Sequence, residues 1–165
     1  MFDMVDKWEV RHYNAAKLGP IQKKQHCLTK DYIVFLSLLE ENQKIAFIDL
    51  AQRLIGSDRK FSSEEIDLFR VMVAEMDLLK VPSPTNRSIG ELAESFDSKK
   101  SKCVAAIELI SLAYADNELA AGEIKMLKEF LWYLDFSEAE ISSMQNWVVR
   151  KYALIGEAKQ LWEQK

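Results

Sequence analysis

Apolar residues recur at three- and four-residue spacing along most of the chain after residue 28, which is the period of an amphipathic α-helix. The first such stripe predicts a helix from Thr29, as its N-cap, through Leu39. A polar stretch at residues 40–42 then predicts a break. The next stripe predicts a second helix from Ile45 to a C-terminus near Gly56.

Serine followed three residues later by glutamate marks further helix starts, because the two residues can form a capping box. The three pairs are Ser62 with Glu65, Ser88 with Glu91, and Ser137 with Glu140. Ser98 is expected to begin a long helix that is apolar around most of its circumference, and therefore central and buried. A further helix is expected from about Ala121 to Leu134. No stretch has the alternating pattern of a strand.

The acidic and apolar pattern occurs twice in the chain, and the two copies align at one constant offset without gaps. The offset aligns Asp116 with Asp58, Glu123 with Glu65, and Asp135 with Asp77. One unit has an apolar face that only a second unit can cover. The sequence therefore predicts an all-α fold: a compact bundle of about seven helices with two pseudo-symmetric helix–acidic loop–helix repeats.

The chain is expected to form one domain preceded by an arm. Residues 1–28 are interpreted as a poorly defined N-terminal arm that places Trp8 and Tyr13 on the domain surface. Residues 29–165 are interpreted as a single helical domain, with repeats at about 30–80 and 88–137 and then a C-terminal helix. The two prolines in residues 81–86 forbid a helix there and mark the connector between the repeats.

Composition excludes several function classes. The net charge of −4 argues against broad nucleic-acid binding, which needs a basic surface. No apolar run reaches the roughly 20 residues of a membrane-spanning helix, so we expect no membrane span and a cytoplasmic location. Two cysteines cannot build a zinc cage, and Cys103 is expected to be a buried free thiol. With no glycine-rich phosphate loop and no histidine-rich motif, no enzyme is predicted.

The two acidic loops contain the candidate site. In each loop an aspartate ends one helix and a glutamate lies in the first turn of the next, so Asp58, Glu65, Asp116 and Glu123 could supply oxygen ligands to Ca²⁺ or Mg²⁺. An EF-hand is excluded, because Ala121 and Leu127 stand where that motif needs glycine and glutamate. The alternative is structural: the glutamates cap helices and the aspartates bond to nearby backbone N–H groups.

The segment Ala113–Leu119, followed by Glu123 and an apolar helix, resembles the TerB family of tellurite-resistance-associated proteins and the related domain of membrane-anchored DnaJ-like co-chaperones. The family pattern is an apolar helix ending in Ala-Asp-Gly, a turn, an acidic residue and a second helix. Asn117 takes the place of the glycine, and the first copy at Ser57-Asp58-Arg59 departs further. The resemblance implies an acidic metal site, a role in tellurite or stress response, and no defined enzymatic activity.

The apolar stripes also predict the core and a partner surface. Near-complete burial is expected for Val104, Ile107, Ile124, Leu127 and Leu131, and core positions for Trp132, Tyr133 and Phe136. Trp147, Arg150 and Trp162 are instead expected on the surface, in contact with a protein partner or a second copy of the chain, because Trp and Arg are enriched at interfaces. A helical interaction scaffold without metal is therefore the alternative function.

Overall fold

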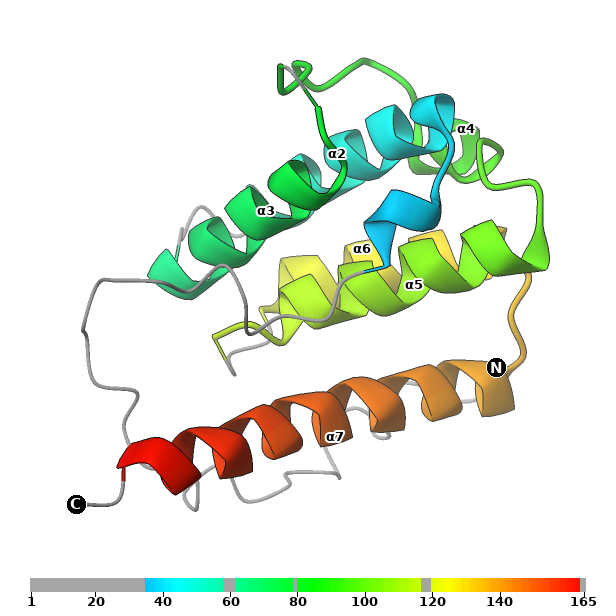
Figure 1. Ribbon diagram of the computed structural model, residues 1–165. Helices are drawn as coiled ribbons and strands as arrows, with labels where there is room; N and C mark the ends of the chain where they lie inside the picture. The colour runs from blue at the N-terminus through cyan, green and yellow to red at the C-terminus, as the bar shows by residue number, and fades with distance from the viewer. Residues whose placement is uncertain (1–34, 58–61, 79, 117–119, 164–165) are drawn as a thin grey trace.

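In the computed structural model, the described parts of the chain are residues 35–57, 62–78, 80–116 and 120–163. These residues form α-helices joined by turns, and they contain no strand (Figure 1). In chain order the elements are the short 3-10 turn η3 (Leu36–Leu38), α2 (Glu41–Ile55), α3 (Ser63–Glu75), α4 (Ile89–Ala93), α5 (Lys99–Ala113), α6 (Ala121–Tyr133) and α7 (Glu138–Glu163). The all-α prediction is confirmed for this part of the chain.

The three predicted capping boxes are present and begin α3, α4 and α7. In the first, the Ser62 Oγ accepts a bond from the Glu65 backbone N–H at 3.1 Å, and the Glu65 carboxylate accepts from the Ser62 N–H at 3.0 Å. Ser88 with Glu91 and Ser137 with Glu140 make the same pair of bonds. These local bonds satisfy backbone donors that have no partner inside the helix.

The first predicted helix differs from the structure. Residues 29–34 lie outside the described residues, and the remainder of the predicted span contains only the 3-10 turn, closed by the bond from the Leu39 N–H to the Leu36 carbonyl at 3.1 Å. The expected break at residues 40–42 is also wrong, because α2 begins at Glu41. Its start is stabilised by the Gln43 side chain, which accepts from the Glu40 N–H at 3.1 Å.

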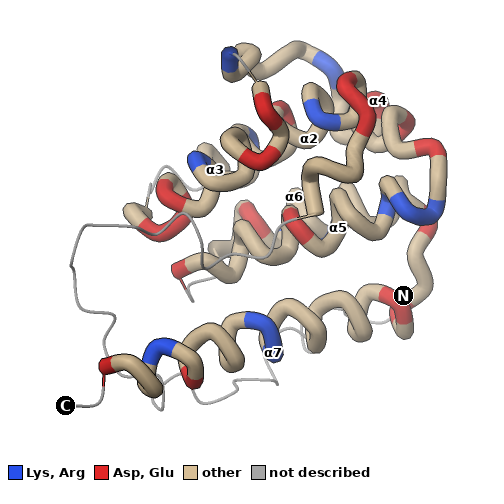
Figure 2. The backbone as a smooth tube through the Cα atoms, viewed as in Figure 1, with Lys and Arg blue, Asp and Glu red and all other residues tan. Residues whose placement is uncertain are grey.

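Helix α5 is the centre of the bundle. It packs against η3, α2, α3, α6 and α7, and ten of its fifteen residues are buried. In Figure 1, α2 and α3 lie above α5 and α6, and α7 runs below them. The lysines of α5 gather at its N-terminal end, which leaves the rest of this helix almost free of basic charge (Figure 2). The prediction of a central, buried helix beginning after Ser98 is confirmed.

Equivalent helices of the two halves have equal lengths and equivalent ends. The offset that aligns Asp116 with Asp58 also aligns both ends of α5 with those of α2, and both ends of α6 with those of α3. A tertiary contact recurs at the same offset. The Lys44 ammonium donates to the Met76 carbonyl at 3.1 Å, and the Lys102 ammonium donates to the Leu134 carbonyl at 3.4 Å. Each lysine thus bonds to the C-terminal end of the helix that follows its own.

The core predictions are confirmed at Val104, Leu127 and Leu131 and wrong at Ile107 and Ile124, which are only half-buried. The inward face of α6 carries Glu123, Met126, Leu127 and Phe130. Ile124 follows Glu123 directly and is therefore turned to the side of that face. No helix in the described part of the chain is both long enough and apolar enough to cross a membrane.

Candidate cation site

The candidate site is built from the first turns of α3 and α6. Glu65 is the third residue of α3, and its carboxylate is held by the backbone N–H and the hydroxyl of Ser62, at 3.0 and 2.9 Å. Glu123 is the third residue of α6, and its carboxylate accepts from the Ala120 N–H at 2.9 Å. Because alanine stands at position 120, Glu123 has no hydroxyl donor equivalent to that of Ser62.

The fold brings these two carboxyl groups together. The side chains of Glu65 and Glu123 hydrogen-bond to each other, and both residues are buried, with 4% and 2% of their surface exposed. Burial, and then the negative charges of Glu65 and Asp116, raise the pKa of Glu123 to about 8. At neutral pH the Glu123 carboxyl group therefore keeps its proton.

The close approach of the two halves also depends on a glycine. Gly122 lies in the first turn of α6, and a Cβ atom there would come within 3.0 Å of the backbone carbonyl oxygen of Ser57. Backbone cannot yield to a new methyl group as a flexible side chain can. The end of the first half therefore lies against the start of α6, one residue from Glu123.

Of the four predicted ligands, Glu65 and Glu123 meet, and Asp116 lies near enough for its charge to act on Glu123. Asp58 lies outside the described residues. Among the residues that the structure describes, no group of three or more His, Cys, Asp or Glu side chains is arranged to hold a metal ion. The described part of the site is thus a hydrogen-bonded pair of carboxyl groups with a third acid nearby.

A second buried polar cluster, which sequence reasoning missed, joins α5 to α7 and to residue 35. Glu108 is fully buried, and its Oε1 accepts from the Phe35 N–H at 2.9 Å, whereas its Oε2 has no hydrogen-bond partner. The Lys151 ammonium donates to the Ser111 hydroxyl at 2.8 Å. The Tyr152 hydroxyl donates to the Ser111 carbonyl at 2.7 Å.

The charges of this cluster influence each other. Burial raises the pKa of Glu108 to about 7, against the opposing effect of the Lys151 charge. Burial likewise lowers the pKa of Lys151. A sequence signal was available: Glu108 is the only charged residue between Val104 and Ala113, and Lys151 falls on the line of the apolar residues Met144 and Val148. Charges at such positions indicate buried partners.

The predicted partner surface is only partly exposed. Trp162 is 63% exposed and Arg150 is exposed, but Trp147 is half-buried and its ring packs against that of Phe35, with centroids 5.7 Å apart. The predicted core positions of Trp132 and Tyr133 are wrong: these residues are 72% and 45% exposed. They end α6 on its outward side, whereas Phe130, Leu131 and the following Leu134 face the core.

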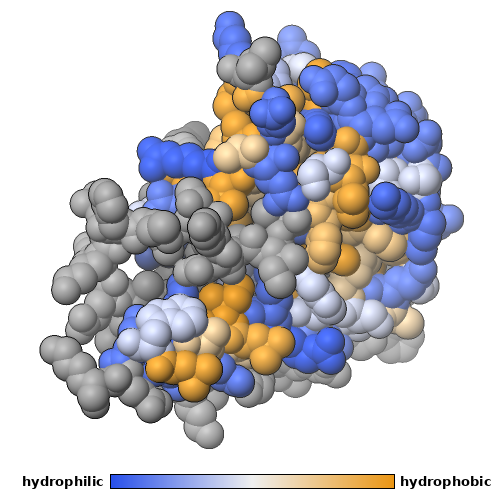
Figure 3. All heavy atoms as spheres, in the orientation of Figure 1, coloured by the Kyte–Doolittle hydropathy of each residue, from blue (hydrophilic) through white to orange (hydrophobic). Residues whose placement is uncertain are grey.

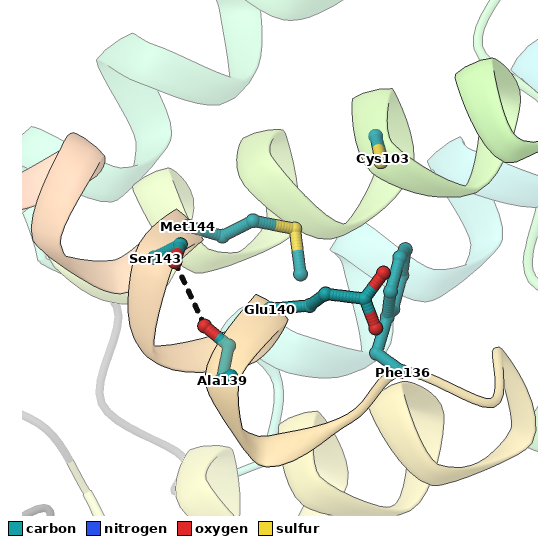
Figure 4. A pocket seen from close by; sticks show the side chains of 6 residues that line it. All are labelled: Cys103, Phe136, Ala139, Glu140, Ser143 and Met144. Carbon is teal, nitrogen blue, oxygen red and sulfur yellow. Dashed lines mark hydrogen bonds between the residues drawn. The ribbon is translucent and has the colours of Figure 1, made fainter.

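A pocket of about 300 Å³ lies between the beginning of α5 and the beginning of α7 (Figure 4). Its lining residues are Cys103, Phe136, Ala139, Glu140, Ser143 and Met144. Cys103 is a free thiol, as predicted, but it is half-buried rather than buried. The Glu140 carboxylate is engaged by Lys99 and by Ser137, so the pocket presents a mainly apolar wall.

Comparison with family models, with curated proteins and with solved structures finds no match for this chain. The resemblance to the TerB family therefore stays a prediction, and function has to be inferred from the arrangement of residues.

Proposed function

We propose that this protein is a non-enzymatic, TerB-like helical module that takes up a divalent cation, Ca²⁺ or Mg²⁺, between its two halves. The observation that carries the proposal is the buried hydrogen bond between the carboxyl groups of Glu65 and Glu123. Two buried carboxylates repel each other unless a proton or a cation lies between them. A hard divalent cation favours carboxylate oxygens and would replace the proton on Glu123.

The neighbouring acids support this proposal. Asp116 adds a negative charge beside Glu123, and the sequence repeat places Asp58 at the equivalent position of the first half. The Ser62 N–H and hydroxyl both donate to one oxygen of Glu65, and the Ala120 N–H donates to one oxygen of Glu123. The other carboxylate oxygens remain as ligands. The resemblance to the TerB family connects such a module to tellurite or stress response.

The test is calorimetry and thermal unfolding of the full chain with Ca²⁺, Mg²⁺, Mn²⁺ and Zn²⁺. A cation that binds the folded state raises the melting temperature, and the increase grows with the logarithm of its concentration. We expect Glu123→Gln combined with Asp116→Asn to abolish the increase. The matched control is Glu91→Gln, which removes an exposed capping glutamate far from the pair. Equal increases in all three proteins would contradict the proposal.

We further infer that residues 41–75 and 99–133 are pseudo-symmetric units related by a twofold rotation. The equal helix lengths and the recurring lysine contacts at the offset of the sequence repeat support this inference. A rotation of this kind explains why the equivalent residues Glu65 and Glu123 face each other, since residues near a twofold axis meet their own counterparts. Superposition of the two units is the measurement that tests it.

A protein-interaction role is the second candidate function, and the exposed end of α6 favours it. Trp132 and Tyr133 stack edge-to-face with ring centroids 4.9 Å apart, and their counterparts in the first half are Ala74 and Glu75. Exposed tryptophan is enriched at interfaces. Self-association, measured by sedimentation velocity, is expected for the wild type and lost in Trp132→Ala. A monomeric wild type would contradict self-association through this surface.

A further inference from the structure

The C-terminal part of α7 extends beyond the helix against which it packs. Its contacts with α5 include the bonds from Lys151 and Tyr152 to Ser111, and α5 ends two residues later, at Ala113. Residues 153–163 continue for about another 16 Å at the usual rise of a helix. None of these eleven residues is buried.

An apolar stripe runs along this extension. Leu154, Leu161 and Trp162 are 63%, 77% and 63% exposed. Leu154 and Leu161 are seven positions apart and so lie two turns apart on the same face of the helix, and Trp162, eight positions after Leu154, borders that face; these three side chains are named the distal stripe. Figure 3 shows apolar side chains over the second half of α7. An exposed stripe of this kind is a docking surface, because burying it is favourable.

Phe35, which follows residues 1–34 in the sequence, contacts α7 two helical turns before this stripe. Phe35, the first described residue, is fixed by its N–H bond to Glu108 and by the contact of its ring with Trp147. Trp147 lies seven residues before Leu154 and fourteen before Leu161, which is about 10 Å and about 21 Å along the helix. About seven extended residues cover the longer distance. The segment that precedes Phe35 is therefore more than long enough to reach the whole stripe.

The composition of this segment complements the domain. Residues 1–34 contain six Lys or Arg and four Asp or Glu, which gives the segment a net charge of +2. Residues 35–165 contain 16 Lys or Arg and 22 Asp or Glu, a net charge of −6, and the extension itself carries Glu157, Lys159 and Glu163. The segment also supplies apolar side chains, including Trp8, Val10 and Tyr13. Opposite charge and apolar anchors are the two features that a partner of the stripe needs.

We propose that the occupant of the distal stripe of α7 is the N-terminal segment of the same chain, residues 1–34. A segment attached at Phe35 acts at an effective concentration in the millimolar range. A second copy of the chain, present at micromolar concentration, competes poorly with it.

The test uses the full chain with a nitroxide spin label on the Cys27 thiol, in the Cys103→Ser background and enriched in ¹⁵N. Cys27 lies eight residues before Phe35 and so reaches at most about 28 Å from it. We expect the label to reduce the amide signals of residues 153–163 at least twofold relative to the chemically reduced label. The double variant Leu154→Glu/Leu161→Glu restores these signals, whereas Gln160→Glu, on an exposed position of the same helix, does not.

Two outcomes would overturn the proposal. Undiminished signals of residues 153–163 in the labelled wild type would show that the segment does not cover the stripe. The second outcome uses a mixture of spin-labelled chains without ¹⁵N and ¹⁵N chains without the label. If the amide signals of residues 153–163 fall as much in this mixture as in the labelled ¹⁵N chain, a second copy covers the stripe instead. The amide signals of α5 report folding in every sample, and Trp162→Glu provides an independent single substitution should the double variant unfold.

Discussion

Asp77 and Asp135, which the sequence repeat makes equivalent, both adopt left-handed backbone conformations, with φ of 52° and 59°. They are the only non-glycine residues with positive φ in the described part of the chain. Each follows the C-cap residue of a helix, α3 or α6, at the position where glycine is most common. Aspartate tolerates this conformation better than most residues, but it places a negative charge at the negative end of the helix dipole.

Asp135→Asn is expected to raise the free energy of unfolding by about 0.3–1 kcal/mol, because asparagine tolerates the left-handed conformation and carries no charge. Asp135→Val should instead lower it by about 1–2 kcal/mol, the cost of a side chain that disfavours positive φ. Urea unfolding at low ionic strength measures both. As a control, Glu41→Gln removes an acid from the first turn of α2 and should destabilise slightly. A stabilised Asp135→Val would contradict the assignment.

The raised pKa of Glu123 predicts how stability depends on pH. The folded state holds a proton up to about pH 8, whereas an ordinary glutamate loses it near pH 4.5. The stabilisation is therefore complete below pH 4.5 and is lost as pH rises through about 8. Glu123→Gln keeps a neutral side chain at every pH and should remove this loss. Urea unfolding at unit intervals from pH 5 to 9 tests this.

Glu108 has its pKa raised to about 7, so it also makes the folded state less stable as pH rises, but this loss of stability ends at a lower pH than that of Glu123. The decline that remains above pH 7 is therefore the part assigned to Glu123. If the stability of wild type and of Glu123→Gln changed with the same slope between pH 7 and 9, the raised pKa of Glu123 would be contradicted.

Leu127→Ala is expected to lower the free energy of unfolding by about 2–5 kcal/mol, because Leu127 is fully buried in α6 and truncation leaves a cavity. Trp132, five residues later and 72% exposed, provides the contrast. Its replacement by alanine should change stability by no more than about 0.5 kcal/mol. A large loss in Trp132→Ala would mean that this side chain belongs to the core, as its sequence pattern alone suggested.

Thr85 fastens the connector between the two halves to α2. Its backbone N–H and hydroxyl donate to the buried Asp49 carboxylate at 2.9 and 2.6 Å. Burial alone would raise the pKa of Asp49, but the bonds from Thr85 and Arg53 outweigh it and hold the pKa below its usual value. Thr85→Val should therefore cost about 1.5–3 kcal/mol in chemical unfolding. Ser83→Ala, at an exposed position of the same connector, should be neutral.

Local bonding explains why much of the fold could be predicted from the sequence. A capping box needs only two residues three positions apart, so the starts of α3, α4 and α7 could be identified without tertiary information. The start of α2 could not, because Glu40 and Gln43 do not have the usual serine–glutamate pattern. The repeat at a constant offset likewise revealed the equivalence of Glu65 and Glu123.

By itself the sequence determined the helical class and most helix boundaries, since these depend on contacts within a few residues. Only the tertiary structure decided which equivalent residues meet. Glu65 and Glu123 are far apart along the chain, yet they share a hydrogen bond. Glu108 and Lys151 interact only because α7 packs on α5, and Trp132 is exposed because the face of α6 that packs on the core carries Phe130, Leu131 and the following Leu134 instead. Burial and pKa depend on such long-range packing, which helical periodicity does not encode.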